Sequence, residues 1–515
     1  MPSESEKDET IPERPPEAIW CERYEHIVQV MPHERLERYA PGGFHPVALG
    51  DTFCNGRYTV RHKLGHGGYS TVWLARDHQE NRWVSIKIKQ AYVSTCELAQ
   101  DPEVKSLKLL EKRYQNSIAT KSRCFPELLG YFRHTGPNGT HTCLVTELLG
   151  PAISTVQRVF EESHVYHSMT LTNFESANYD MDSILGAGDW TFQPHVVLRT
   201  SKQLLEALAD THQAGIAHGD ITPNNVVFTC REVCHSDRDL WDALCKPRIA
   251  PYTGEEPRSA HFPQQLVGST MWLGWYDNEW EDIRLIDWGD SYPVDETRSE
   301  LSEPITLRSP ETFFLDFFDY RHDLWRAGCV IYELFFQKHP FGSYICSDVD
   351  SIRHIIMKIG PLPSEWHARW EEVSNGDTQV DFRGDETWVR KPLVDIFEPR
   401  RNNIVSIFEK NVAYDDGEDD DHKRREDYEA LRTLLHPMVG LMQHEPAKRI
   451  SVQEAASYIQ WTDRWREWPP NKEDSDGDGS DGYSFADKGS EGDGFEEEGE
   501  GLSDDGLGHL FELAL

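Results

Sequence analysis

The sequence has no run of about 18 consecutive apolar residues, the length that a membrane-spanning helix requires. Its first ten residues are acidic and polar, and they lack the basic start and apolar core of a secretory signal. The ten cysteines are scattered and form no Cys-x-x-Cys pair. Cys230, Cys234 and His235 lie close together, but no second cluster completes a zinc site. We therefore expect reduced cysteines and a chain in the cytoplasm, the nucleus or both, without a membrane partner.

Positive charge is also scarce. The chain has 52 Lys and Arg residues against 89 Asp and Glu residues, and its formal net charge is −37. Because binding to nucleic-acid phosphates requires cations, this balance argues against a direct nucleic-acid partner. It is compatible with a basic protein partner, although many acidic proteins have no such partner.

The composition predicts a disordered tail at each end of the chain. Residues 1–18 are rich in Pro and Glu, and residues 463–515 are dominated by Asp, Glu, Gly and Ser. Such segments bury too little apolar area to offset the entropy that ordering costs.

Between the tails, a strand-rich part precedes a helical part. Residues 57–64, 70–76 and 82–89 are rich in β-branched and aromatic residues and are separated by turn residues, which predicts three strands. From about residue 195 helical periods dominate. Val196, Leu204, Leu205, Leu208 and His212 fit one long helix, and Leu324, Val330, Ile331 and Leu334 fit another. These patterns indicate an α+β protein.

A glycine-rich segment lies between the first two predicted strands. It runs Leu64-Gly65-His66-Gly67-Gly68-Tyr69-Ser70-Thr71-Val72. Glycines let backbone N–H groups approach phosphates without a side chain intervening. Ser70 stands where the usual GxGxxGxV pattern has its third glycine. A glycine-rich hairpin turn would look the same, so this segment alone is a weak signal.

A single lysine among apolar neighbours follows on the third predicted strand. Val84-Ser85-Ile86-Lys87 resembles the V-A-I-K strand whose lysine binds the α- and β-phosphates of ATP. That lysine needs a carboxylate from a helix, and Glu103 is our first candidate, with Glu97 as the alternative. Asp101 and Pro102 predict the N-cap and first turn of that helix.

Two further motifs supply the remaining groups for phosphoryl transfer. His218-Gly219-Asp220-Ile221-Thr222-Pro223-Asn224-Asn225 has the D-x-x-x-x-N spacing of a catalytic loop. It predicts Asp220 as the base that accepts the substrate hydroxyl proton and Asn225 as a magnesium ligand. Asp287, in Leu285-Ile286-Asp287-Trp288-Gly289, has the position of the D-F-G aspartate that also binds magnesium.

Three motifs would support these groups without taking part in the chemistry. Ser309-Pro310-Glu311 stands where protein kinases have Ala-Pro-Glu, and Asp323 begins a D-x-W-x-x-G pattern. Arg449 lies where an arginine pairs with that glutamate. The four motifs with chemical roles and these three supporting motifs occur in the order that a protein kinase requires.

The chain resembles the eukaryotic protein kinase superfamily over about residues 57–462, and most closely the fungal SR-protein kinases. The narrower match rests on Glu37-Arg38-Tyr39-Ala40-Pro41-Gly42-Gly43-Phe44-His45-Pro46, on the glycine-rich segment, and on the long spacer between Asn225 and Asp287. The resemblance implies a two-lobed kinase fold with a small β-rich N-lobe and a larger helical C-lobe. Its expected limits are an N-terminal extension at 19–56, an N-lobe at 57–149 and a C-lobe at 150–462, with a spacer insert at 230–281.

The resemblance also implies a function: a monomeric Ser/Thr protein kinase that uses ATP and Mg²⁺ on basic, Arg/Ser-rich splicing proteins. Thr146 would guard the back of the adenine pocket, and the backbone of Glu147 and Leu149 would hold the adenine edge. Asp348, Asp350 and the region 381–386 are candidates for an acidic substrate groove.

Three positions depart from the family pattern. Thr222 stands where kinases usually have a lysine that steadies the γ-phosphate. Gly219 replaces an arginine, so no cationic pocket exists there for a phosphorylated activation loop, and we expect activity without that phosphorylation. Trp288 replaces the phenylalanine of D-F-G.

Two other functions are compatible with parts of the sequence. Thr222 suggests a catalytically weak pseudokinase that acts as a scaffold for protein partners, but Lys87, Asp220, Asn225 and Asp287 argue against it. His218-Gly219-Asp220 suggests a small-molecule phosphotransferase of the aminoglycoside or choline type. That group lacks the pairing of Glu311 with Arg449.

Overall fold

The structure of the chain is a computed structural model whose described residues all lie within residues 1–461, the first of two units of the chain. The described residues are 23–116, 122–159, 192, 194–234, 236–254, 258–275, 281–299, 305–341, 347–374 and 429–461. The predicted tails at 1–18 and 463–515 lie outside them, as does the region 381–386.

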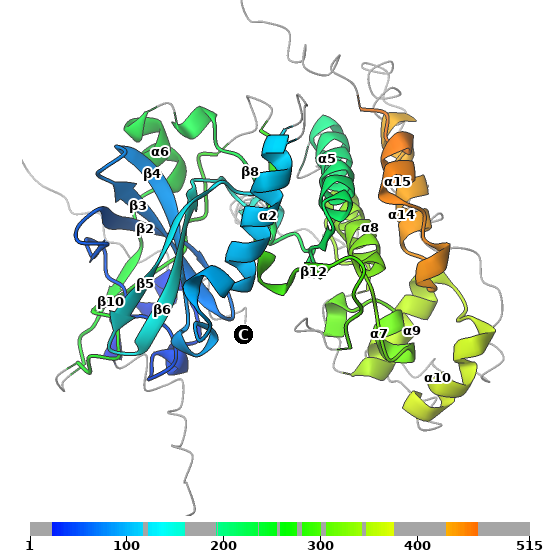
Figure 1. Cartoon of the computed structure of the whole chain (residues 1–515), viewed down its shortest axis with the longest axis horizontal. Coiled ribbons are helices and arrows are strands. Elements are labelled where there is room, and N and C mark those ends of the chain that lie inside the picture. The colour runs from blue at the N-terminus through cyan, green and yellow to red at the C-terminus, as the bar shows by residue number, and fades with distance from the viewer. Residues whose placement is uncertain are drawn as a thin grey trace, which may run out of the picture. The chain divides into compact units, whose positions relative to one another are not determined.

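An antiparallel sheet of six strands, in the order β1-β2-β3-β4-β6-β5, organises the first part of the chain (Figure 1). The strands are β1 (Thr52–Phe53), β2 (Tyr58–His66), β3 (Ser70–Asp77), β4 (Arg82–Lys89), β5 (Leu128–Gly136) and β6 (Gly139–Glu147). Strands β2, β3 and β4 confirm the three strands predicted from the sequence. Helix α2 (Pro102–Asn116) contacts this sheet at β5.

Side-chain alternation along β4 separates the core from the functional face. Val84, Ile86 and Ile88 are fully buried in the sheet's hydrophobic core with Trp73 of β3. Because successive side chains of a strand point to opposite faces, Lys87 projects away from that core. The same pattern that buries the apolar residues therefore directs the lysine to the other face.

Four helices pack together in the second part of the chain (Figure 1). They are α5 (Pro194–Gln213), α8 (Arg321–Phe336), α14 (Leu435–Leu441) and α15 (Val452–Tyr458). Leu204 and Leu208 of α5 and Val330 and Ile331 of α8 are completely buried. Both long helices predicted from the apolar periods are confirmed, and so is the order of a strand-rich part followed by a helical part.

The remaining elements are short. The helices are α6 (Asp237–Leu244), α7 (Glu311–Phe314), α9 (Asp348–Ile359) and α10 (His367–Ser374). The 3₁₀ turns are η1 (Ile27–Val30), η2 (Leu36–Arg38), η3 (Ala91–Val93), η4 (Leu98–Gln100), η5 (Glu232–Cys234), η6 (Trp288–Asp290), η7 (Ile305–Leu307), η8 (Ser364–Trp366) and η9 (Pro446–Lys448). No described helix combines the length and the apolar character that crossing a bilayer would need.

Two small ribbons connect loops that are distant in sequence. Strand β7 (Ile216–Ala217) pairs with β12 (Tyr292–Pro293), and β8 (Val226–Phe228) pairs with β11 (Ile283–Leu285). The segment between β7 and β8 contains Asp220 and Asn225, and the segment between β11 and β12 contains Asp287. The two ribbons therefore bring these two predicted motifs side by side.

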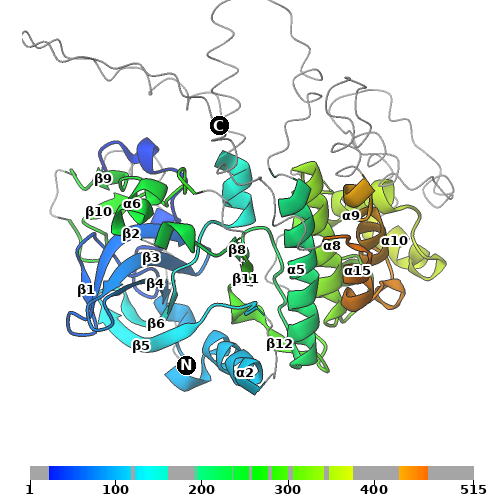
Figure 2. The same cartoon turned by 90° about the horizontal axis from the view of Figure 1, so that it is seen from above.

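The spacer at 230–281 is more ordered than its aperiodic sequence indicates. Its described residues form α6 and a hairpin of β9 (Ile249–Pro251) and β10 (Gln265–Val267). Trp241 of α6 stacks on His62 and makes an edge-to-face contact with Trp83 of the sheet, and Val267 joins the sheet core. Figure 2 shows α6 and the hairpin beside β2 and β3. The spacer follows the segment of Asp220 and Asn225 in sequence, but it packs on the sheet. Its elements are too short for a periodic pattern of apolar residues to show.

The N-terminal segment packs between the spacer hairpin and the sheet. Tyr24, Ile27, Val30, Leu36, Tyr39 and Phe44 are buried against Ala250 and Leu266 of the hairpin. Glu34 forms a fully buried ion pair with Lys63 of β2. Burial by itself would raise the pKa of Glu34, but the charge and hydrogen bond of Lys63 outweigh it and lower the pKa to about 2.

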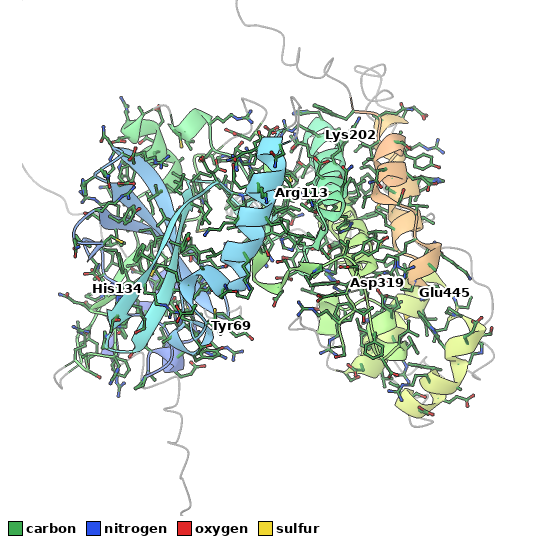
Figure 3. The ribbon with its side chains drawn as sticks, in the orientation of Figure 1. Tyr69, Arg113, His134, Lys202, Asp319 and Glu445 are labelled. Carbon is green, nitrogen blue, oxygen red and sulfur yellow. The ribbon has the colours of Figure 1, made fainter. Side chains whose placement is uncertain are left out.

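Three histidines from separate segments meet at the edge of the sheet. The ring of His45 lies 4.5 Å from that of His134 on β5 and 5.1 Å from that of His141 on β6 (His134 is labelled in Figure 3). Burial, together with the neighbouring rings of His134 and His141, lowers the pKa of His45 from 6.5 to about 3. Burial also lowers the pKa of His134 and His141. The folded protein therefore keeps these rings neutral.

Acid is expected to destabilise the fold through these rings. Below pH 6.5 these rings bind protons in the unfolded chain but stay neutral in the folded protein. The folding stability present above pH 6.5 is therefore lost as the pH falls toward 3. Each such ring contributes up to about 1.4 kcal/mol per pH unit. Urea unfolding across this range should show a shallower pH dependence for His45→Gln. The exposed control His26→Gln should behave like the parent, and equal slopes in both variants would contradict the assignment.

Candidate active site

The sheet register aligns the glycine-rich segment with Lys87. Gly65 on β2 faces Val72 on β3, and Val72 faces Lys87 on β4. The loop between β2 and β3 closes with a hydrogen bond from the Gly67 N–H to the Ser70 carbonyl, at 2.9 Å. Tyr69 at its tip is exposed (Figure 3). The loop backbone and the lysine thus lie on adjoining strands.

Lys87 joins two carboxylates from different parts of the chain. Its Nζ lies 2.8 and 3.0 Å from the two carboxylate oxygens of Glu103 on α2, and 2.7 Å from Oδ1 of Asp287. The second interaction spans 200 residues of sequence. Of the two candidates for the helix carboxylate, the structure places Glu103 on the lysine.

The start of α2 fixes the position of Glu103. Oδ1 of Asp101 accepts hydrogen bonds from the N–H groups of Glu103 and Val104, which confirms the predicted N-cap. Lys89 binds the carboxylate of Asp101 at 2.8 Å and lies 3.1 Å from Glu103. Two lysines on one face of β4 therefore hold the first turn of the helix.

Electrostatic interactions keep Lys87 and Asp287 charged. Burial by itself would lower the pKa of Lys87, but the charges of Asp287 and Glu103 outweigh it and raise the pKa above the usual value. Burial would raise the pKa of Asp287, and the lysine lowers it instead. Lys87 and Asp287 are therefore both charged at neutral pH.

Asp323 at the start of α8 holds the loop that carries Asp220. Its two oxygens accept hydrogen bonds from the backbone N–H groups of His218 and Gly219, at 2.8 and 2.9 Å, and from His212 at 2.8 Å. Burial would raise the pKa of Asp323, but the hydrogen bond from His212 and its charge outweigh it and lower the pKa. The D-x-W-x-x-G aspartate thus underlies the loop, as expected.

Within the loop, Asn225 and Asp220 contact each other. Nδ2 of Asn225 donates to Oδ2 of Asp220 at 2.7 Å and to its backbone carbonyl at 2.9 Å. The Ile286 N–H, next to Asp287, donates to the Asn225 carbonyl at 2.9 Å. The structure therefore brings Asp220, Asn225 and Asp287 into one continuous hydrogen-bonded region.

Trp288 packs firmly behind Asp287. Its indole N–H donates to the Leu285 carbonyl at 2.7 Å, its ring centre lies 4.5 Å from that of His218, and the side chain is completely buried. Asp287 itself has a left-handed backbone with φ of 65°. Non-glycine residues adopt this conformation rarely, and functional sites are where it concentrates.

Gly219 meets two geometric demands. Its φ is +83°, and a Cβ atom at this position would lie 2.6 Å from the Asp290 carbonyl oxygen. Both observations favour glycine here over the arginine that the family usually has.

The predicted adenine-binding residues lie on β6 and just after it. Thr146 faces Ser85 of β4 and Glu147 faces Val84, while Leu149 follows the strand and is half-buried. The Gly150 N–H donates to the Phe228 carbonyl at 2.8 Å. This bond ties the end of the sheet to β8, directly after Asn225.

Thr222 is buried, and the carbonyl of the residue before it binds Arg326, a cation to which the sequence motifs assigned no role. Arg326 of α8 is completely buried, and its Nε donates to the Ile221 carbonyl at 2.9 Å. Its Nη1 also donates to the Leu307 carbonyl at 3.2 Å. Because α8 also contains Arg321, His322, Asp323 and Glu333, an arginine in this helix gave no signal of its own.

Arg38 and Gln90 are further residues to which the sequence motifs assigned no role. Nε2 of Gln90 donates to the Gly68 carbonyl at 3.0 Å, and Nη1 of Arg38 donates to Oε1 of Gln90 at 3.3 Å. The N-terminal segment therefore contacts the glycine-rich loop. No pattern within either segment predicts a contact between residues so far apart in sequence.

The two described groove candidates lie in the first turn of α9. Oδ2 of Asp350 accepts a hydrogen bond from the hydroxyl of the N-cap residue Ser347 at 2.7 Å. Asp348 lies 3.7 Å from Arg308, and half of its side chain is exposed. Asp350 therefore has a clear role in capping the helix, and Asp348 is the more exposed acid.

Arg449 and Glu311 form the ion pair that the sequence predicts. Two guanidinium nitrogens of Arg449 lie 2.7 and 2.5 Å from the two carboxylate oxygens of Glu311, and both side chains are buried. Arg449 also donates to the Arg321 carbonyl at 2.7 Å. The pair links α7 to the start of α8 and to η9.

No family model matches the chain, but curated relatives do. It is 32% identical to protein kinase dsk1 of Schizosaccharomyces pombe over 205 residues, 39% of this chain and 32% of that protein. It is 23% identical to the serine/threonine-protein kinase SRPK of Physarum polycephalum over 441 residues, 82% of this chain and 90% of that protein. It is 44% identical to human SRSF protein kinase 3 over 112 residues, 22% of this chain and 19% of that protein.

The chain is similar to the SR-protein kinases. This similarity confirms the resemblance predicted from the sequence motifs. The alignments span 32% of dsk1 and 24% of the yeast kinase SKY1, so they cover less than two thirds of these relatives.

Removing one member of the buried ion pair is expected to destabilise the protein strongly. Glu311→Gln leaves the Arg449 charge buried without its counter-ion, which costs about 3–5 kcal/mol. The matched control is Glu445→Gln, which breaks the exposed pair with Lys448 and should have little effect. Denaturant unfolding of both variants measures the difference. Equal stability of the two would show that the buried pair does not brace the helical part.

Proposed function

We propose that the chain is an active Ser/Thr protein kinase with the two-lobed kinase fold, which transfers the γ-phosphate of ATP to protein hydroxyls. The observation that carries this proposal is the position of Lys87, 2.8 Å from Glu103 and 2.7 Å from Asp287. A kinase needs this lysine between the helix carboxylate and the metal-binding aspartate. The similarity to named protein kinases supports the same function.

In this proposal Asp220 is the base. Its carboxylate orients the substrate hydroxyl and accepts the proton as that oxygen attacks the γ-phosphorus. The Asn225 amide donates to Oδ2 of Asp220 at 2.7 Å, which fixes the orientation of this carboxylate. Lys87 and the backbone of the Gly65–Val72 segment would bind the phosphates, and Thr146, Glu147 and Leu149 the adenine.

Asp287 and Asn225 fit a magnesium site. Nδ2 of Asn225 is engaged by Asp220, so its amide oxygen can face a cation, and 45% of the Asp287 side chain is exposed. Among the described residues, no group of three or more His, Cys, Asp or Glu side chains forms a metal site by itself. Magnesium needs only one or two protein carboxylates when phosphates complete its shell. Bound magnesium would neutralise charge on the phosphates during transfer.

The substrate class we propose is basic, Arg/Ser-rich protein. The net charge of −37 supports a cationic partner and argues against direct contact with nucleic acid. The name of the human relative, SRSF protein kinase 3, points to SRSF proteins as that relative's substrates. Asp348 is a candidate contact because of its exposure at the start of α9.

We also propose domain limits and a cellular location for the chain. We place the catalytic domain at 57–462 and the extension at 19–56, and we expect a monomer in the cytoplasm, the nucleus or both. The packing of residues 23–56 on the sheet and spacer supports the extension as part of the folded unit.

Asp220→Asn is expected to lower kcat by at least about 10²-fold, because the substrate hydroxyl loses its base. Binding of Mg·ATP should change little, since Lys87 and Asp287 remain. Transfer of radiolabel from ATP to an Arg/Ser peptide measures kcat, and calorimetry measures nucleotide binding. The control Asp242→Asn removes an exposed carboxylate of α6.

Two outcomes separate this function from the alternatives. A protein that binds Mg·ATP but phosphorylates neither peptides nor small amines would be a scaffold. Transfer to small amines but not to peptides would indicate a small-molecule phosphotransferase.

Thr222→Lys is expected to raise kcat by about tenfold or more, because it restores a cation near the γ-phosphate. Thr222→Met is the matched control, since it adds length without charge. The peptide assay at saturating ATP compares the two variants. If both variants had the same rate, the missing lysine would not limit this protein.

A further inference from the structure

Two cysteine sulfurs touch at the end of β8. Sγ of Cys230 lies 3.4 Å from Sγ of Cys234, in a turn closed by a hydrogen bond from the Cys234 N–H to the Cys230 carbonyl at 3.2 Å. Cys230 is buried with 3% of its surface exposed, whereas Cys234 is exposed. One sulfur is therefore accessible to a solute, and the other lies directly behind it.

The buried thiol also contacts the segment proposed to bind adenine. Cys230 shares its single S–H between the Leu148 carbonyl oxygen, at 3.4 Å, and the sulfur of Cys234, at 3.4 Å. Leu148 stands between Glu147 and Leu149, whose backbone groups are the proposed adenine contacts. The Gly150 N–H donates to Phe228 of β8, two residues before Cys230. A chemical change at the Cys230 sulfur would therefore disturb the segment of Glu147–Leu149. It would act through the bond to Leu148 and through the neighbouring bond between Gly150 and Phe228.

The two thiols differ in reactivity. The hydrogen bond from Cys230 lowers the pKa of Cys234, so the exposed sulfur becomes a thiolate more readily. The same hydrogen bond and burial raise the pKa of Cys230, which stays protonated. This is the arrangement of an attacking thiolate beside a resolving thiol.

We propose that Cys230 and Cys234 form a redox site that hydrogen peroxide oxidises to a disulfide and that thereby weakens nucleotide binding. The Cys234 thiolate attacks one peroxide oxygen, the O–O bond breaks, and Cys234 becomes a sulfenic acid as hydroxide leaves. Sγ of Cys230 then attacks the sulfenic sulfur. Its proton and the sulfenic hydroxyl leave as water, and the two electrons lost by the thiols have reduced the peroxide.

Oxidation would affect nucleotide binding because Cys230 loses its S–H proton. In the disulfide Cys230 has no S–H to donate, so the Leu148 carbonyl loses this hydrogen bond. Bond formation also draws Sγ of Cys230 toward Cys234 from 3.4 Å, away from its present position. We expect affinity for Mg·ATP to fall by about threefold, the effect of one modest hydrogen bond.

The first experiment tests the disulfide and does not depend on the proposed kinase function. The full-length chain is treated with hydrogen peroxide and digested without reductant, and the peptides are mapped by mass. We expect a Cys230–Cys234 link that lacks two hydrogens and that a thiol reductant reverses. Cys234→Ser should abolish the link, and Cys54→Ser, at another exposed cysteine, should keep it. Oxidation of Cys234 to sulfinic acid without any link would overturn the proposal.

The second experiment tests the effect on nucleotide, and it rests on the proposed function. Calorimetry compares Mg·ATP binding to the reduced and the oxidised chain. The expected loss is about threefold in the parent and in Cys54→Ser, and absent in Cys234→Ser, which folds around an exposed substitution. A disulfide that leaves the affinity unchanged would overturn the link to Leu148. A reduced chain that binds no nucleotide would instead refute the kinase proposal and leave the disulfide result standing.

Discussion

The interaction of Lys87 with Glu103 and Asp287 is the constraint on which the rest of the site depends. A strand, a helix and a loop that follow one another over 200 residues of sequence meet at a single ammonium group. Each partner needs its own support, because a displaced carboxylate would leave a partly buried charge without a counter-ion. The N-cap Asp101 supplies that support for Glu103, and the packing of Trp288 on His218 supplies it for Asp287.

A second buried carboxylate fixes the loop that faces this group. Both carboxylate oxygens of Asp323 accept hydrogen bonds, from two backbone N–H groups and from His212. Asp323 therefore positions the loop backbone and takes no part in chemistry itself. Arg326, one helical turn further along α8, holds the Ile221 carbonyl of the same loop. One helix therefore fixes the loop of Asp220 at two points, through Asp323 and Arg326, which are both completely buried.

The sequence predicts the helices, the strands and the order of the motifs well, because each of them has a recognisable pattern within a short stretch of sequence. The three strands are rich in β-branched and aromatic residues, the two long helices have apolar periods, and Asp220 and Asn225 keep a fixed spacing. The contacts of Arg38, Gln90 and Arg326 have no such pattern. They join segments whose side chains are ordinary in their local context, and only tertiary packing decides their partners. The sequence also does not show where the spacer packs, because tertiary contacts decide its position. In addition, α6 and the β9–β10 hairpin are too short for a periodic pattern of apolar residues to show.

The spacer and the N-terminal segment explain how a small sheet keeps its glycine-rich strand in place. Strand β2 leads into that loop, and it is held from both sides. Lys63 pairs with Glu34 of the N-terminal segment, while its backbone carbonyl accepts a hydrogen bond from Thr270 of the spacer at 3.0 Å. A buried ion pair is only a weak source of net stability, but it selects one arrangement over others because every alternative leaves a charge unpaired. The pair therefore fixes the register of the N-terminal segment on β2, and hence the place of Arg38 beside the loop.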